Sequence, residues 1–327
     1  MKRNVIISLI LAAVTVSCGK AEQPVASSAV PLSVDVSSGD VMAARSPISG
    51  TALPVSRSIV MAAYYNAPGG GGSNYFSGRI FSYHSGTTWQ LSSAYWPLAG
   101  SLDMLGYSLA DASHVSSVIW GGNNAASVTM TLADNSGNQD DLVVGGASAL
   151  TSASKAITFR HAETMLAFTA YTDVAYNASS NTGVTVTGLT VNGAYHSGTV
   201  SCTRSGSAVS FFWSSLGSSA AALSLPSLSS TDLGVSAAAL AGTPGLILPA
   251  QSAVAFTVYY TLHCGRDGLG GAIDKSMSYT HTPAGSWSAG TKYTYCLYIT
   301  NSGVTVNLAD AFAWTDGIEI GDDFVWE

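Results

Sequence analysis

Apolar side chains along this chain alternate with polar ones or form short runs, which is the pattern of β-strands rather than of helices. Asn192-Gly193 and Asn301-Ser302-Gly303 are the clearest hairpin turns, because Asn and Gly tolerate positive φ. Only 218–223 is a candidate helix. The β-rich runs lie at 58–65, 79–83, 102–109, 127–132, 156–160, 165–170, 183–191, 209–213, 253–262, 292–299 and 304–308. Many short strands at this spacing predict an all-β chain built of sandwiches.

Both ends of the chain carry strand-like patterns. Near the start, three apolar residues alternate with polar ones: Leu32, Val34 and Val36. Near the end, most even positions from 304 onward are large and apolar, and aspartates interrupt the row. Its last members are Ile318, Ile320, Phe324 and Trp326. Because such strands bury one face, each of the two segments needs a sheet to pair with.

The composition agrees with an all-β chain. The 327 residues predict two domains, and a small-residue stretch at 145–154 suggests domains at 46–154 and 155–327. Only 9% of the residues are charged, whereas soluble domains carry roughly 25%. The net charge of −7 and the absence of a basic stripe argue against a nucleic-acid partner.

The N-terminus has the pattern of an export signal. Lys2 and Arg3 precede an apolar region of twelve residues at 5–16, which is too short to span a bilayer. Small residues then lead to Cys18, as in a bacterial lipobox, so residues 1–17 are predicted to be a lipoprotein signal peptide and Cys18 the lipidated residue. An ordinary signal peptide with a chance cysteine is the alternative. Residues 18–45 form a tether that contains the first strand.

Three further cysteines, Cys202, Cys264 and Cys296, leave at least one thiol without an intramolecular partner. Cys264 and Cys296 lie in β-rich runs that would suit a disulfide between paired strands. Three buried free thiols are the other interpretation. No C-x-x-C spacing of a zinc or redox site occurs.

A search for catalytic motifs gives nothing specific. The six histidines form no H-E-x-x-H pattern, and no G-x-S-x-G elbow has a convincing context. Asp134, Ser136, Asn138 and Asp140 alternate like calcium ligands, but a polar turn explains them better. Trp120, beside Gly121, is the best candidate for an exposed ring that stacks on a sugar. We therefore expect no catalytic residues, no metal and no cofactor, and a protein that is not an enzyme.

A series of short motifs runs across the chain. They are the lipobox at Cys18, A-R-S-P-I-S-G-T at 44–51, the run at 58–65, Y-W-P at 95–97, F-R-H-A at 159–162, I-L-P-A-Q at 247–251 and W-S-A-G-T-K-Y-T-Y at 287–295. In order and spacing this series resembles the fimbrillin family of Bacteroides-type anaerobes, the pilins of their surface fimbriae. The absence of a Lys near position 165, with Glu163 in that region, departs from the family pattern.

The resemblance implies two tandem transthyretin-like, Greek-key β-sandwich domains and a lipoprotein precursor in the outer membrane. It also implies proteolysis after Arg45, so that Ser46 becomes the N-terminus and the strand with Leu32, Val34 and Val36 departs. The open groove then accepts the C-terminal strand of another subunit, here the segment with Ile318, Ile320, Phe324 and Trp326. Arg57 is the other local arginine, but it directly precedes a strand and is expected to be less accessible.

The sequence thus predicts a structural subunit of a surface fimbria that serves adhesion, with other pilin subunits as partners. Removal of the first strand would expose unpaired sheet edges, which template pairing with another chain. One alternative is a monomeric surface lipoprotein that binds a host glycan or protein. Another is a tip or anchor subunit of the same class of pilus.

Overall fold

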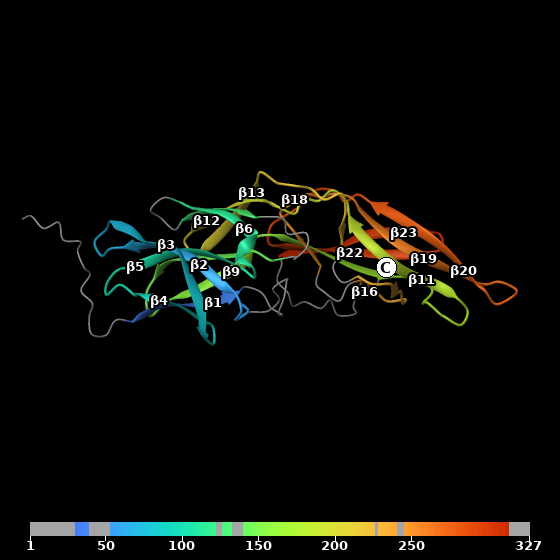
Figure 1. Ribbon diagram of the computed structural model, residues 1–327, viewed down its shortest axis with the longest axis horizontal. Coiled ribbons are helices and arrows are strands. Elements are labelled where there is room, and N and C mark those ends of the chain that lie inside the picture. Colours follow the sequence, from blue (N-terminus) through green and yellow to red (C-terminus); the bar gives the residue numbers. More distant parts are fainter. Residues whose placement is uncertain are drawn as a thin grey trace, which may run out of the picture.

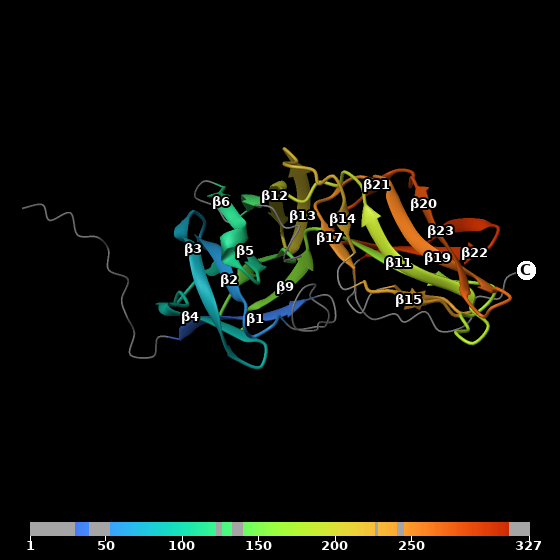
Figure 2. The same ribbon diagram turned by 45° about the vertical axis from the view of Figure 1, so that its right-hand side comes forward.

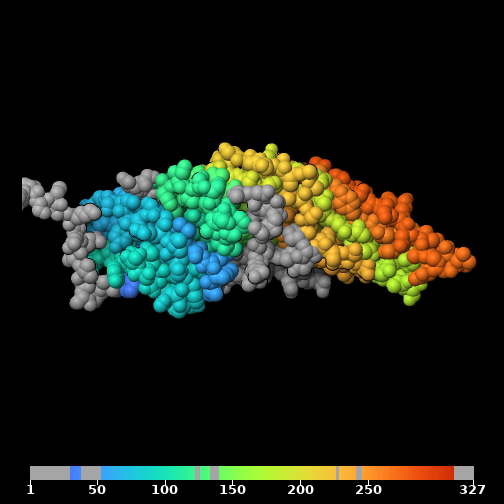
Figure 3. Space-filling view, in the orientation of Figure 1, coloured from blue at the N-terminus to red at the C-terminus, as the bar shows by residue number. Residues whose placement is uncertain are grey.

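The computed structural model describes residues 30–38, 53–121, 126–132, 140–225, 228–240 and 245–313 of the protein. These residues form an elongated molecule with an N-terminal half at one end and a C-terminal half at the other (Figures 1 and 3). Nearly all regular structure is β, which confirms the all-β prediction, and the one helical turn described is the 3-10 helix η1 (Ala112–His114). Within the described ranges, no helix is long and apolar enough to cross a membrane.

The N-terminal half contains a closed barrel of seven strands in the order β1-β4-β3-β2-β5-β8-β9. The side chains of β1 and β9 alternate between buried and more exposed positions, and the inward-facing side chains of the barrel form one core around Trp89, Phe81 and Phe159. The strands are β1 (Pro31–Ser38), β2 (Ser58–Asn66), β3 (Gly72–Ser85), β4 (Thr88–Tyr95), β5 (Ser101–Leu109), β8 (Val143–Leu150) and β9 (Ala156–His161).

A four-stranded sheet covers one side of this barrel in the order β13-β12-β7-β6. Its strands are β6 (Val115–Trp120), β7 (Ser127–Leu132), β12 (Gly198–Ser205) and β13 (Ala208–Ser214). Val128, Met130 and Val200 pack with Leu105 and Val144 of the barrel in a second core. The hairpin β12–β13 therefore lies in the N-terminal half, although it follows β10 and β11 in sequence. The division at residue 154 stays a prediction.

The C-terminal half is a sandwich of two sheets, in the orders β16-β10-β22-β23 and β14-β11-β19-β20. Phe168, Phe256, Tyr295 and Trp287 fill the core between them. Its strands are β10 (Thr164–Tyr171), β11 (Thr182–Val191), β14 (Leu223–Ser224), β15 (Thr231–Asp232), β16 (Ala238–Ala239), β17 (Leu246–Leu248), β18 (Gln251–Ser252), β19 (Phe256–Arg266), β20 (Ala272–His281), β21 (Ser286–Trp287), β22 (Thr291–Thr300) and β23 (Gly303–Ala313).

Two local predictions differ from the structure. Residues 218–223 are not helical and lead into the two-residue strand β14. Gly193 has the positive φ of 74° expected of a turn, but the strands that flank it do not pair with each other. The turn instead sends the chain from β11 in the sandwich to β12 beside the barrel. By contrast, Asn301-Ser302-Gly303 does join a hairpin, since Thr300 pairs with Gly303.

Candidate functional site

The first strand completes the N-terminal barrel. β1 pairs antiparallel with β4 along 31–35 and parallel with β9 along 35–38. Figures 1 and 2 both show it between these two strands. No other described strand joins β4 to β9, so the barrel is closed only while β1 is in place. We call the space that β1 occupies between β4 and β9 the β1 slot.

The inner face of β1 is fully buried. Leu32 and Val34 expose 0% of their surface and Val36 exposes 1%, and all three belong to the barrel core. Val34 lies opposite Trp89 of β4, and Val36 lies opposite Ile157 of β9. Burial of each such side chain contributes about 1.5–3 kcal/mol. The departure of β1 would therefore expose an apolar slot flanked by two unpaired strand edges.

Polar groups on the outer face of β1 fix its register. The Asp35 carboxylate accepts a 2.8 Å hydrogen bond from the Thr88 hydroxyl and lies 3.5 Å from the Lys155 ammonium. Lys155 also donates to the Ser33 hydroxyl at 3.1 Å. These contacts lie at a half-exposed surface, where ion pairs contribute about 1 kcal/mol or less. Burial of apolar residues thus holds β1 in the slot, and the outer polar contacts help to set its register against the neighbouring strands.

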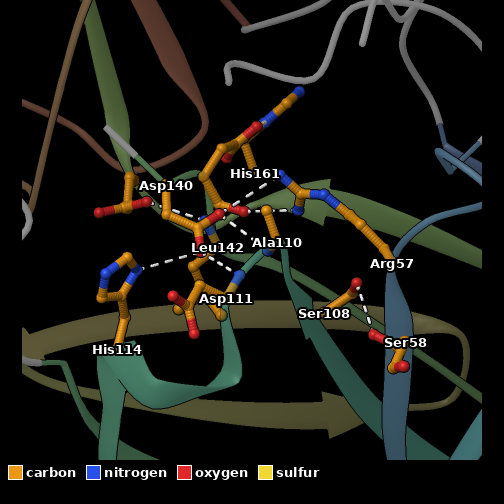
Figure 4. Close-up of polar contacts among 11 residues, drawn as sticks. Arg57, Ser58, Ser108, Ala110, Asp111, His114, Asp140, Leu142 and His161 are labelled. Atoms are coloured by element: carbon orange, nitrogen blue, oxygen red, sulfur yellow. Dashed lines mark hydrogen bonds and ion pairs between the residues drawn. The ribbon is translucent and has the colours of Figure 1, made fainter. Parts of the chain in front are cut away.

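Arg57, which precedes β2, is 4% exposed and points into a buried group of charged residues (Figure 4). Its guanidinium donates to the Asp141 carbonyl at 2.8 Å and to the Asp140 carboxylate at 3.4 Å. The same Asp140 carboxylate accepts from the backbone N–H groups of Ala110 and Asp111 at 2.9 and 2.7 Å. Arg57 is therefore shielded from a protease, as its position before a strand led us to expect.

Two histidines and a glutamate extend this group. His161 Nδ1 lies 2.9 Å from the Asp141 carboxylate, and His114 Nδ1 lies 3.2 Å from that of Asp140. The Glu163 carboxylate, 0% exposed, accepts from the N–H of Leu142 at 2.8 Å. Burial lowers the pKa of Arg57, and the negative charges of Asp141, Asp140 and Glu163 oppose that shift.

The junction between the two halves of the molecule runs through Ala162 and Glu163. Trp213 of β13 donates its ring N–H to the Ala162 carbonyl at 2.6 Å. The Glu163 carbonyl accepts from the N–H of Gly290, which precedes β22, at 2.7 Å. The Glu163 carboxylate also accepts from the N–H of Leu142, the residue before β8. This residue therefore links the barrel to the sandwich with both its backbone and its side chain.

Sequence reasoning missed this charged group as a unit. Its members come from segments up to about a hundred residues apart, and only folding brings them together. The one signal was the scarcity of charge: in a chain with 9% charged residues, adjacent aspartates at the start of a strand are conspicuous. Asp140, which the alternating pattern made a candidate calcium ligand, instead binds Arg57 and two backbone amides. Across the described residues, no group of three or more His, Cys, Asp or Glu side chains could hold a metal ion.

Several predicted site residues lie outside the described residues. They are Cys18, Arg45 and Ser46 near the start of the chain, and Ile318, Ile320, Phe324 and Trp326 at its end. Their roles stay predictions. Leu32, Val34 and Val36 are the predicted site residues that the structure describes, and it brings all three together in the β1 slot.

The remaining candidates from the sequence are Trp120 and three cysteines. Trp120 is half-buried and stacks on Tyr107 with ring centroids 6.1 Å apart, so its ring is not a free platform for a sugar. Cys202, Cys264 and Cys296 are all free, so Cys264 and Cys296 form no disulfide. The interpretation as three buried free thiols is correct only for Cys202, because Cys264 is exposed and Cys296 is half-buried. Burial raises the pKa of Cys202 to about 12, so this thiol stays protonated at neutral pH.

Comparison with known proteins gives one family. A model described as fimbrillin-like matches residues 51–310. No curated protein matches the sequence. Similar solved structures include a proposed cell adhesion protein from Bacteroides uniformis, 13% identical, with a TM-score of 0.45 over 87% of this chain and 98% of that one.

Two further structures are similar to this chain. One is a proposed cell adhesion protein from Bacteroides ovatus, 10% identical, with a TM-score of 0.47 over 89% of this chain and 100% of that one. The other is the C-terminally truncated tip fimbrial protein Mfa3 from Porphyromonas gingivalis, 12% identical, with a TM-score of 0.38 over 87% and 99%. All three TM-scores are below 0.5, and the family match over residues 51–310 is what assigns the chain.

Proposed function

The chain belongs to the fimbrillin-like family, and from this premise we propose that it is a fimbrial subunit that assembles by exchange of β-strands. The family makes it a fimbrial or adhesion protein of the cell surface, with a structural rather than a catalytic role. The finer proposal includes lipidation of Cys18 in the precursor and proteolysis after Arg45. It also includes two tandem transthyretin-like domains and association with other fimbrial subunits.

The β1 slot is the observation that carries this proposal. β1 is joined to the rest of the barrel through residues 39–57, and Arg45 lies within that segment. A cut there separates β1 from every other strand of the barrel. The vacated slot offers the free edges of β4 and β9 and an apolar floor that includes Trp89 and Ile157. Such a slot favours an incoming extended segment with alternating apolar residues.

The C-terminal segment fits that description. In an extended chain, alternate residues share one face, so a strand formed by this segment would present Ile318, Ile320, Phe324 and Trp326 together, as β1 presents Leu32, Val34 and Val36. The two aromatic side chains would bury more apolar area than the valines of β1, at about 25 cal/mol per Å². Replacement of β1 by this segment of a neighbouring subunit therefore has a favourable driving force and would link subunits into a fibre.

The first test is the intact mass and N-terminal sequence of the protein recovered from the cell surface. A mature chain that begins at Ser46 is the expected result. Arg45→Ala should block fibre formation, whereas Arg79→Ala, at an exposed arginine of β3, should leave it unchanged. Fibres that form normally with Arg45→Ala would contradict the proposal. A lipid-bearing chain that begins at Cys18 would instead indicate an anchor subunit or a monomeric surface lipoprotein.

A further inference from the structure

The two faces of the four-stranded sheet β13-β12-β7-β6 differ in chemistry. Its inner face packs on the barrel with apolar side chains such as Val128, Met130 and Val200. The outer positions pair across the strands in rows: Ser117, Thr131, Thr199 and Ser214 in the first, Ile119, Thr129, Ser201 and Phe212 in the second, and Ser127, Thr203 and Ser210 in the third. We call this outer surface the hydroxyl face, because Ser and Thr occupy all of these positions except two.

Each row of the hydroxyl face contains one pair of hydroxyls in hydrogen-bond contact across neighbouring strands. The oxygen–oxygen distances are 3.0 Å for Thr131 with Thr199, 3.0 Å for Thr129 with Ser201, and 2.8 Å for Thr203 with Ser210. A hydroxyl group has one proton to donate and two lone pairs that accept. Within a pair only one O–H donates to the other oxygen, so the second O–H and the remaining lone pairs can serve a ligand.

Two exposed apolar side chains lie at the ends of the middle row. Ile119 of β6 exposes 67% of its surface, and Phe212 of β13 exposes 68%. Single exposed apolar residues are common on proteins and need no explanation by themselves. Here both belong to one row, about 14 Å apart at ~4.8 Å per strand, with Thr129 and Ser201 between them. The row therefore offers an apolar contact at each end and hydroxyls in the middle.

None of the residues that make up the hydroxyl face is ionisable, since all are Ser, Thr, Ile or Phe. Arg204, the charged residue of β12, points to the barrel side of the sheet, where its guanidinium lies 3.2 Å from the Asp103 carboxylate of β5. Proteins recognise phosphate, sulfate and carboxylate groups mainly with Arg and Lys. The composition of this face therefore favours a neutral ligand.

The size of the hydroxyl face limits what can cover it. Strands at ~4.8 Å spacing and rows that repeat every ~6.8 Å give an area of roughly 200 Å². A stable contact between two proteins covers about 800 Å² on each partner. A second copy of the chain would therefore need much more surface than this face provides, whereas a short oligosaccharide matches its extent.

We propose that the hydroxyl face binds an extended, neutral oligosaccharide that lies along the middle row from Ile119 to Phe212. A sugar ring carries C–H groups on its faces and hydroxyls around its edge. The C–H groups would pack on the exposed Phe212 ring and on Ile119. The sugar hydroxyls would exchange hydrogen bonds with Thr129 and Ser201.

The place of the hydroxyl face keeps it apart from the β1 slot. Figures 1 and 2 both show β6, β12 and β13 on the side of the N-terminal half opposite β1. Binding of an oligosaccharide is a property of the single chain and does not rest on the proposed function. In a fibre, repeated copies of the face would bind one polysaccharide at many points and raise the overall affinity. Only that last consequence requires assembly.

Calorimetric titration of the full chain with three neutral, extended, β-linked probes tests the proposal: cellohexaose, mannohexaose and chitohexaose. At least one should bind, and Phe212→Ala should weaken that binding about 10-fold. Phe312→Ala is the matched control and should leave it unchanged, because Phe312 is 57% exposed on β23 of the other half. Thr129→Val keeps the shape of the side chain, removes the hydroxyl and should weaken binding about 3- to 10-fold.

Three results would overturn the proposal. One is the absence of binding by all three probes at about 10 mM. Another is equal affinity of Phe212→Ala and the unsubstituted chain for a probe that binds. The third is a dimer, seen by sedimentation, that Phe212→Ala dissociates, because a second copy would then be the occupant. Both phenylalanines are exposed, so neither substitution should unfold the chain. Fibre formation is scored separately, and its failure would count against strand exchange alone.

Discussion

Each half of the molecule contains a strand near one end of the described chain, and the two strands differ in how fully they are buried. Leu32 and Leu308 both face the inside of a β-structure from a strand near one end of the chain. Leu32 is fully buried because β1 closes the barrel between β4 and β9, whereas Leu308 is half-exposed because nothing described lies beyond β23. The barrel is therefore closed, and one of its strands, β1, precedes Arg45 in sequence. In the sandwich, β23 pairs with β22 and with no other described strand.

The halves also differ in what they bury. The barrel side encloses Arg57, Asp140, Asp141 and Glu163, while the sandwich core consists of aliphatic and aromatic residues. Buried charges are tolerated only with partners in good geometry, so the packing around Arg57 permits little movement.

The largest expected effect comes from the buried charges. Arg57→Ala leaves the Asp140 carboxylate and the Asp141 carbonyl without their guanidinium donor, and removal of one partner from a buried ion pair costs about 3–5 kcal/mol. Arg266→Ala is the matched control in the other half, because Arg266 is exposed and binds backbone carbonyls of Ala178, Ser179 and Gly270. It should cost about 1 kcal/mol or less. Urea unfolding gives the loss in the free energy of unfolding for each variant. Equal losses would contradict the expectation that the buried arginine contributes more to stability than the exposed one.

The next effect compares the two leucines directly. Leu32→Ala removes a fully buried side chain from the barrel and should lower the free energy of unfolding by about 2–5 kcal/mol. Leu308→Ala in a chain that ends at Ala313 should cost less than about 1 kcal/mol, because half of that side chain already contacts water. Unfolding midpoints in urea give both values. A Leu308 loss as large as that of Leu32 would contradict the difference in burial between the two side chains.

Much of the strand content could be predicted from the sequence because alternation is a local signal. The run predicted at 127–132 is β7 itself, and that at 156–160 lies within β9. Long strands with one buried face, such as β22, were recognised for the same reason. Strand β6 was missed because its burial pattern is irregular. Alternation also predicted that Leu32, Val34 and Val36 lie in a strand, although it did not predict where that strand lies in the barrel.

The pairing of strands was less predictable because partners lie far apart in sequence. Asn192-Gly193 has the composition of a hairpin turn, yet β12 pairs with β7 rather than with β11. The tertiary advantage of covering the barrel core with Val200 and Cys202 outweighs the local preference for a hairpin. The group around Arg57 was missed for the same reason: no local period marks residues that meet only through folding.

A smaller effect concerns the hold on β1. Asp35→Ala removes the acceptor of the Thr88 hydroxyl and the partner of Lys155, both at a half-exposed surface. The expected loss is about 1 kcal/mol or less, since the apolar face of β1 is unchanged. Amide exchange of residues 30–38 should therefore accelerate by about 5-fold or less. Ser37→Ala is the control, because its hydroxyl makes only a long 3.5 Å contact with Thr158. A complete loss of protection would show that polar contacts, not burial, retain the strand.

The smallest effect lies on the open edge of the sandwich and depends on pH. Hydrogen bonds from Asn181 and His263 lower the pKa of Asp274, which lies near the start of β20. A carboxylate with a lowered pKa stabilises the fold above its unfolded value, near 3.9, and loses that contribution as the pH falls through the folded value. Asp274→Asn should therefore lower the urea midpoint slightly at pH 7, and the difference from the unsubstituted protein should shrink as the pH falls through the lowered pKa of Asp274. Asp267→Asn, in the turn before β20, controls for local charge. A difference that persists undiminished in acid would mean that the carboxylate charge does not help to hold β20 against β19.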